Sequence, residues 1–444
     1  MATGSPLDRL DPGRFPFEPF DPERAPDPVE EDHVHRLAAR AAMVGADSYR
    51  LTRAALRREE GILRIGNRFV PISRYREIGF VAVGRASVSQ ALAVVQELGD
   101  AVTQGFVVGP LPLPTEVPFR WLERPCEGAG NAAAPEAAAA VRELAEGLGP
   151  NDLLLVLLSA GALGYLALPP TGETLASWRD RLEKDRRAGA SGQELDAIAR
   201  VTGWGPIAGR LAEGLTCEVA TLLVDRGSGP RLLAGGPTIP IAPTERTGVR
   251  AILQRLGRSE DLDAASRAGL APDASRPISL SENVHRPVVI VEPADALREG
   301  SDALGEKRWI CRLAELENRL PPGAAADRFL ARTDAILAEL GDAPFLRESR
   351  GLAVFGPLTF DLAEGVDERP AVTEFLARTA ASLRRREMTV AAVATGGGPR
   401  GAGLPAGGVV GSKGGPTIRA IRMRQGITDV GILATAALPR HRAQ

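Results

Sequence analysis

The chain has 444 residues, a length typical of two or three domains, and a formal net charge of -2 from 54 basic and 56 acidic side chains. This near balance argues against a dedicated nucleic-acid-binding protein, which would carry a strong basic excess. With no run of 18 apolar residues and only three, widely spaced cysteines, the chain is expected to be cytoplasmic, without a membrane-spanning helix, a disulfide framework or a metal site.

Residues 1–32 are rich in proline and acidic side chains and include Phe15, Phe17 and Phe20. The prolines exclude a regular helix or a central strand in this region. Two interpretations remain open. The region is either a disordered tail or an extended arm whose phenylalanines dock on the folded body or on a protein partner.

Between residues 32 and 60, apolar side chains recur at helical spacing, with a break at Gly45 and Asp47. Two apolar runs around Gly66-Asn67 then predict a β-hairpin. Up to about residue 260, strands and helices alternate as in a parallel sheet covered on both faces. Strands are expected at 78–83, 105–109, 153–158 and 218–225, and helices at 87–98, 135–148, 175–184, 194–213 and 247–256.

The last third predicts a second, smaller α/β unit. We therefore divide the chain into an arm (1–32), an N-terminal domain (33–300) and a C-terminal domain (301–444). The Ala-rich helix near residues 136–144 would permit a homodimer, although core packing explains it equally well. Strands are expected at 287–291, 352–355, 358–362, 389–395 and 427–433, helices at 309–319, 324–340 and 372–385, and a Gly-rich loop at 396–403.

In open α/β sheets, ligands bind beyond the carboxyl ends of the strands, so the loops after the strands are the candidate sites. After the strand at 78–83 come Gly84, Arg85 and Ser87. A glycine lets the backbone approach an anion, a helix N-terminus offers N–H groups, and an arginine adds a fork of donors. Gly and Ser are also common in ordinary strand-to-helix turns, which is the structural alternative.

Two later loops have the same ambiguity. The small residues from Ser159 to Gly164 permit either close ligand approach or tight packing. Asp225, followed by a Gly-rich stretch, could hold a metal or a hydroxyl group, or could cap its own loop. Gly407–Lys413 looks like a phosphate-binding loop but fails the required spacing, because Ser412 separates Gly411 from Lys413.

Taken in order, these loops resemble the class II glycerate 2-kinase family. The family's opening Val-Gly-Ala-Gly-Lys-Ala motif is similar to residues 81–86, and its Ser-Gly-Gly-Gly-Ser-Ala-Leu loop is similar to residues 159–165. Its Lys-Gly-Gly-Arg-Leu-Ala stretch resembles residues 207–212, and its Ser-Asp and Ala-Ser-Gly-Pro-Thr segments resemble residues 224–238. The resemblance is clearest from about residue 33 to 260 and only an outline in the C-terminal third.

The resemblance implies a Rossmann-like parallel-sheet domain paired with a smaller α/β domain. It also implies transfer of a phosphoryl group from ATP, with magnesium, to the 2-hydroxyl of D-glycerate in the cleft between them. The site residues that it implies are Arg85 and Asp225 as catalytic groups, and Gly84, Ser87, Ser159, Gly161, Arg200, Arg210, Gly236 and Thr238 as ligand- or phosphate-binding groups.

Charged positions depart from the family pattern more than glycine and apolar positions do. Arg85 and Ile207 stand where the family has lysines, and the family's Thr-Asp-Gly loop reads Thr395-Gly396-Gly397, without its aspartate. The segment from Phe355 to Phe360 lacks the family's carboxylate. Loss of several groups from one phosphate clamp should nearly abolish catalysis.

Three hypotheses follow. The chain is a pseudoenzyme with a binding, scaffold or regulatory role, in which the arm contacts a partner. Alternatively, it is an active kinase for glycerate or a related hydroxy acid, with ATP and magnesium as cofactors. The third hypothesis is a new reaction, or a sensor for a small anion, in the same cleft.

Overall fold

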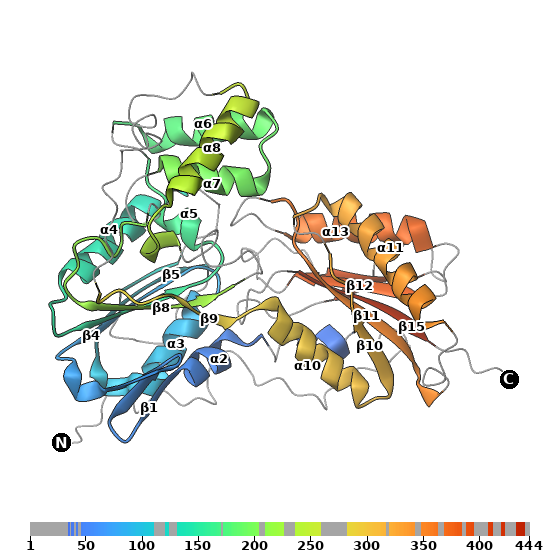
Figure 1. Ribbon diagram of the computed structural model, residues 1–444, viewed down its shortest axis with the longest axis horizontal. Coiled ribbons are helices and arrows are strands. Elements are labelled where there is room, and N and C mark those ends of the chain that lie inside the picture. The colour runs from blue at the N-terminus through green and yellow to red at the C-terminus, as the bar shows by residue number, and fades with distance from the viewer. Residues whose placement is uncertain are drawn as a thin grey trace.

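The computed structural model forms two lobes, each built on its own β-sheet (Figure 1). The arm expected at 1–32 and the Gly-rich loop expected at 396–403 lie outside the residues that the structure describes. The described residues are 34–35, 37–39, 41–42, 46–110, 120–123, 131–169, 172–203, 209–225, 236–258, 282–316, 319–341, 348–362, 368–383, 388–394, 407–411, 419–421 and 432–439.

A fully parallel six-stranded sheet forms the centre of the N-terminal lobe, as the alternating pattern predicts. Its order is β6-β5-β4-β7-β8-β9. The chain runs from β4 outward to β6 and returns to β7 on the other side of β4, so the strand order reverses between β4 and β7. The strands are β4 (Ile78–Val83), β5 (Val102–Gly109), β6 (Arg120–Glu123), β7 (Leu153–Leu158), β8 (Glu218–Val224) and β9 (Val288–Val291).

Helices cover both faces of this sheet, because β4 and β7 are apolar and buried along their whole length. Helices α2 (Ser48–Ala55) and α3 (Ser87–Leu98) lie on one side. The helices on the other side are α4 (Ala134–Glu146), α5 (Ala162–Leu166), α6 (Leu175–Arg187), α7 (Gly192–Thr202) and α8 (Pro243–Arg255). Of these, α6, α7 and α8 lie at the top of the view in Figure 1.

The predicted hairpin around Gly66-Asn67 is confirmed, and a third strand extends it. The sheet consists of β1 (Leu56–Glu59), β2 (Ile62–Ile65) and β3 (Arg68–Pro71). The helical pattern expected to continue to residue 60 is wrong at its end, because α2 stops at Ala55 and β1 pairs with β2.

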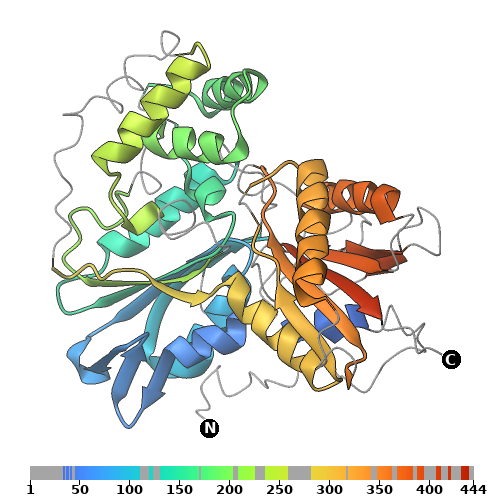
Figure 2. The same ribbon diagram turned by 45° about the vertical axis from the view of Figure 1, so that its right-hand side comes forward.

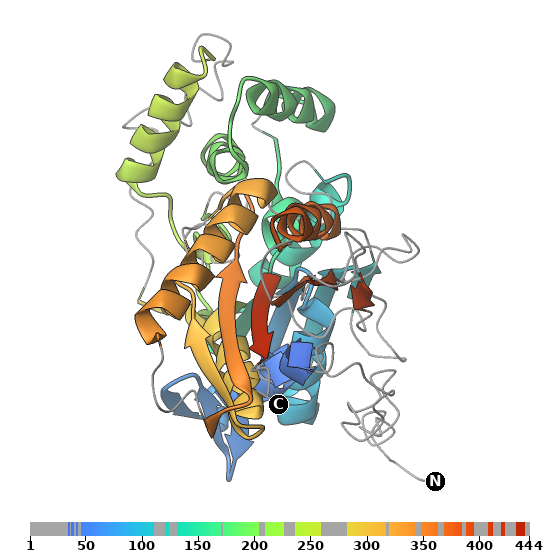
Figure 3. The same cartoon turned by 90° about the vertical axis from the view of Figure 1, so that its right-hand side faces the viewer.

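The C-terminal lobe contains a mixed six-stranded sheet of order β10-β11-β15-β12-β13-β14. Along β11, Leu352 and Val354 face α11 (Pro322–Leu340) and α13 (Arg369–Ser382), which lie side by side in Figure 3. Ala353 faces α10 (Pro293–Gly305) on the opposite side. The strands are β10 (Trp309–Leu313), β11 (Gly351–Leu358), β12 (Thr389–Ala394), β13 (Gly407–Gly411), β14 (Arg419–Ile421) and β15 (Ile432–Pro439).

Three expectations about individual elements are wrong. The helix expected at 309–319 is the strand β10, which pairs with β11 in parallel. The helix expected at 194–213 ends at Thr202. The two strands expected at 352–355 and 358–362 are the single strand β11, which tolerates Pro357 because β10 ends opposite Phe355.

The first described helical residues, 34–35, 37–39 and 41–42, lie on the C-terminal sheet beside α10 (Figures 1 and 2). His35 Nε2 lies 2.8 Å from Thr389 Oγ1 of β12, and a Cβ on Gly300 of α10 would lie 3.3 Å from the Ala38 carbonyl. The start of the described chain therefore packs on its C-terminal lobe. In the part of the chain that the structure describes, no helix is long and apolar enough to cross a membrane.

Candidate functional site

The loops that follow β4 and β7 meet where the strand order reverses. A Cβ on Gly84 would overlap the carbonyl oxygen and the Oγ of Ser159, and the φ of Gly84 is +119°, so only glycine fits there. Ser159 Oγ accepts a hydrogen bond from the Ala86 N–H at 3.0 Å, and the Arg85 N–H donates to the Ala160 carbonyl at 2.8 Å. The structure thus brings Gly84 and Ser159 together and uses Ser159 to hold the neighbouring loop.

Ser87 belongs to the same junction as the first residue of α3. A Cβ on Gly109, at the end of β5, would overlap Ser87 Oγ and lie 2.7 Å from the Gly84 carbonyl. Gly161, with φ +92°, precedes α5 on the β7 side of the junction. Four of the sequence-predicted residues therefore lie at one end of the sheet, where parallel-sheet proteins bind their ligands.

Asp225 and Thr238 lie along the next strand, β8. Asp225 directly follows β8, is buried, and donates its N–H to the Val291 carbonyl at 2.8 Å. Thr238 lies in the short turn from Gly236 to Thr238, and its Oγ1 is 3.0 Å from Thr221 Oγ1 inside β8. This turn packs against α5, which connects it to the β4–β7 junction.

Arg200 is buried in contacts within the N-terminal lobe. Its Nη2 donates to the Ile239 carbonyl at 2.8 Å, and its Nε lies 3.4 Å from Glu245 Oε1. Its side chain is 3% exposed. A guanidinium with these contacts fixes the backbone just after the Gly236–Thr238 turn.

Arg210 lies beside Arg246, a residue that the sequence did not single out. The Arg210 side chain is 24% exposed and lies 3.5 Å from Glu213. Burial, followed by the nearby positive charge of Arg210, lowers the pKa of the buried Arg246 guanidinium. Arg210 lies next to the Gly236–Thr238 turn in the chain's packing, since the following residue, Leu211, donates its N–H to the Pro237 carbonyl.

The Arg85 side chain extends to the C-terminal lobe. Its Nη1 lies 4.0 Å from Oε2 of Glu368, the residue that precedes α13. The Arg85 and Glu368 side chains are 5% and 9% exposed. The cation expected to face a phosphate thus forms a buried ion pair with a carboxylate of the same chain.

The sequence analysis does not identify Glu368, because no local pattern connects it to Arg85. Its neighbour Arg369 is buried as well.

Comparison with known proteins agrees with this architecture. A family model described as "Domain of unknown function (DUF4147)" matches residues 34–271, slightly more than half of the chain. A glycerate kinase of Danio rerio is 25% identical over 339 residues, which span 70% of this chain and 64% of that protein. A D-glycerate 2-kinase of Thermotoga maritima is 27% identical over 201 residues, 40% of this chain and 43% of that protein.

Solved structures extend the similarity of fold to nearly the whole chain. A glycerate kinase from Thermotoga maritima superposes with a TM-score of 0.66 and 18% identity, covering 92% of this chain and all of that one. The expected two-domain α/β fold is thereby confirmed. From the match over residues 34–271 we conclude that this chain belongs to the DUF4147 family, which is the family of the glycerate kinases.

Proposed function

We propose that this family member has lost efficient phosphoryl transfer and keeps its interdomain site to bind a small anion in a scaffold or regulatory role. The observation that carries the proposal is the ion pair between Arg85 and Glu368. A phosphate clamp stabilises the transition state through cations that are available to the transferring group. A carboxylate beside Arg85 offsets the charge that such a clamp requires.

The described residues fit ATP and magnesium poorly for the same reason. A triphosphate placed at Arg85 would bring its negative charge next to the Glu368 carboxylate, and Arg200 is already committed to Ile239 and Glu245. The described part of the chain contains no group of three His, Cys, Asp or Glu side chains arranged to hold a metal ion.

The second candidate function is an active kinase for glycerate or a related hydroxy acid. It is favoured by the close glycine packing at the β4–β7 junction and by the partly exposed Arg210 beside Arg246. In this alternative, Arg85, Arg210 and Asp225 would contact the reacting groups, and ATP with magnesium would supply the phosphoryl group.

A turnover assay separates the two functions. The purified protein is incubated with ATP, magnesium and D-glycerate, and ADP release is followed beside the D-glycerate 2-kinase of Thermotoga maritima as a positive control. We expect turnover below about a thousandth of the control, because losing one stabilising donor alone costs about 10²–10³ in rate. Turnover comparable to the control would contradict the proposal and support the active kinase.

A further inference from the structure

The pair formed by Arg85 and Glu368 crosses from one lobe to the other. Arg85 lies on the loop that connects β4 to α3, and Glu368 lies at the start of α13. The two side chains approach to 4.0 Å, and each is more than nine-tenths buried. Opposite charges attract more strongly in such an environment than in water, because little solvent screens them.

An anionic ligand at Arg85 would compete with Glu368 for the same guanidinium. A second negative charge beside a buried carboxylate is repelled, and both anions would compete for the Arg85 guanidinium. Either the ligand remains unbound or Glu368 withdraws. Because Glu368 belongs to the C-terminal lobe, its withdrawal moves the start of α13 away from the β4 loop.

Other polar contacts between the described residues of the two lobes do not involve Arg85. Arg319 Nη1 lies 3.4 Å from Asp196 Oδ2 of α7, and the Gly192 N–H donates to Asp361 Oδ1 at 2.8 Å. The Arg319 and Asp196 side chains are 9% and 3% exposed, so this second pair is as buried as the first. It therefore provides a matched control for the loss of one buried charge between the lobes.

We propose that Glu368 is a built-in competitor that occupies Arg85 and holds the lobes together until a small anion displaces it. Anion binding and separation of the lobes at this point are then coupled, since one guanidinium serves both contacts. The inference rests on the proposed function only in taking Arg85 as an anion ligand. It adds that Glu368 sets the affinity of the site.

Calorimetric titration with inorganic phosphate tests this competition. Compared with the unmodified protein, E368Q should bind phosphate at least 10-fold more tightly, because the variant keeps the side-chain shape but loses the competing charge. The control D196N should change the affinity less than 2-fold, and adding R85Q to E368Q should abolish the gain. The variant E368D, whose carboxylate lies on a shorter side chain, should increase the phosphate affinity by a smaller factor. It replaces E368Q in the titration if E368Q does not fold.

The competing role of Glu368 is overturned if E368Q binds phosphate no more tightly than the unmodified protein, or if D196N gains as much. It is also overturned if no variant binds phosphate. Small-angle scattering on the unmodified protein should show the lobes moving apart as phosphate saturates the site, and an unchanged radius of gyration would count against the coupling. These readouts do not depend on turnover, so a kinase-active protein would refute the proposed function without deciding the role of Glu368.

Discussion

Gly84 is the residue on which the geometry of the β4–β7 junction depends most directly. Its φ of +119° is unfavourable for other residues, and a Cβ would overlap Ser159. We expect G84A to lower the free energy of unfolding by about 3 kcal/mol, through backbone strain and overpacking together. Urea denaturation measures this loss.

Gly189 provides the matched control for this substitution. Its φ is +97°, but nothing lies within 4 Å of the position that a Cβ would take. G189A should therefore cost only the backbone strain, about 1 kcal/mol. Equal losses for the two variants would show that the contact with Ser159 contributes nothing.

Single residues could be predicted from the sequence where their role is local. Gly84, Ser159 and Asp225 were found because each follows a buried apolar strand whose end can be read from the sequence. Glu368 was not found, because its partner Arg85 is distant in the sequence and only the packing of the two lobes brings them together. Whether these residues bind a ligand stays a prediction.

Helices and strands can be predicted from the sequence where their own apolar pattern is clear. The strands β4 and β7 are continuous apolar runs of six residues, the helix α3 repeats apolar residues at helical spacing, and all three form as expected. The sequence predicts a helix where the strand β10 lies, because a short apolar run is compatible with either a helix or a strand. Here the parallel pairing with β11 makes the segment a strand. The short helix α5 and the strand β6 had no pattern strong enough to be noticed.

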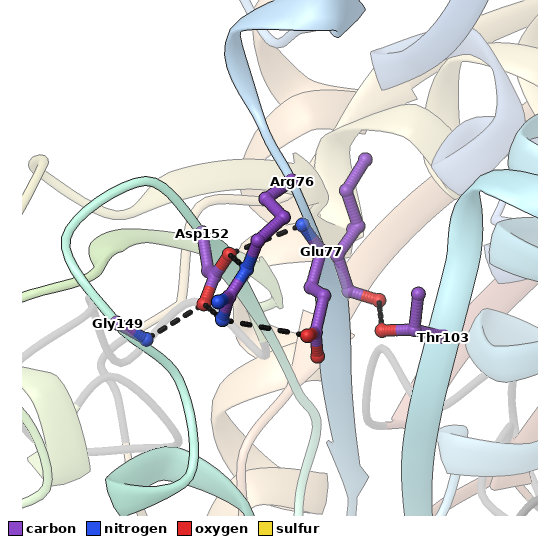
Figure 4. A network of polar contacts seen from close by, with 6 residues as sticks. Arg76, Glu77, Thr103, Gly149 and Asp152 are labelled. Atoms are coloured by element: carbon purple, nitrogen blue, oxygen red, sulfur yellow. Dashed lines mark hydrogen bonds and ion pairs between the residues drawn. The ribbon is translucent and has the colours of Figure 1, made fainter.

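At the opposite end of the sheet from the candidate site, Asp152 ties together the starts of β4 and β7 (Figure 4). Its carboxylate accepts hydrogen bonds from Arg76 at 2.9 and 3.2 Å, from the Gly149 N–H at 2.7 Å and from the Glu77 N–H at 3.1 Å. Burial raises the pKa of Asp152, but the hydrogen bonds from Gly149, Arg76 and Glu77 together outweigh it and hold the pKa below 3.8.

This network predicts a pH-dependent contribution to stability. Because the pKa of Asp152 is lower in the folded than in the unfolded protein, its contribution is complete above pH 3.8 and is lost as the pH falls through the lower folded value. The difference in unfolding free energy between the protein and D152N should therefore be largest at pH 6 and shrink below pH 3.8. Urea denaturation across this range measures it.

The exposed pair of Asp327 and Arg378 provides the comparison for D152N. Hydrogen bonding from Arg378 lowers the pKa of Asp327 as well, but both side chains are about half exposed. Solvent screens such a pair, so D327N should change stability much less at pH 6. If D152N and D327N behave alike, the buried network does not provide the stability assigned to it.

At the scale of the whole molecule, the lobes are joined by contacts of two kinds. Polar contacts bridge them at Arg85 and Glu368 and at Asp196 and Arg319. An apolar cluster joins the described helical residues between 34 and 42 to α10 and the C-terminal sheet, and it also includes Ala86 and Val224 of the N-terminal lobe. Because this cluster spans the junction of the lobes, a substitution at the start of the described chain should disturb the packing of the C-terminal sheet.

Gly300 of α10 tests that connection. A Cβ there would lie 3.3 Å from the Ala38 carbonyl and 3.4 Å from the Phe355 ring, so a larger side chain must push the helical backbone at Ala38 away. In G300L, amide hydrogen exchange should accelerate at least 10-fold at the described helical residues between 34 and 42, while β4 exchanges as before. G305L, on the same helix with nothing within 4 Å of its Cβ position, should leave both regions unchanged. Unchanged exchange at the described helical residues between 34 and 42 in G300L would show that these residues do not depend on the close approach of α10, and the apolar connection between the lobes would lose its main support.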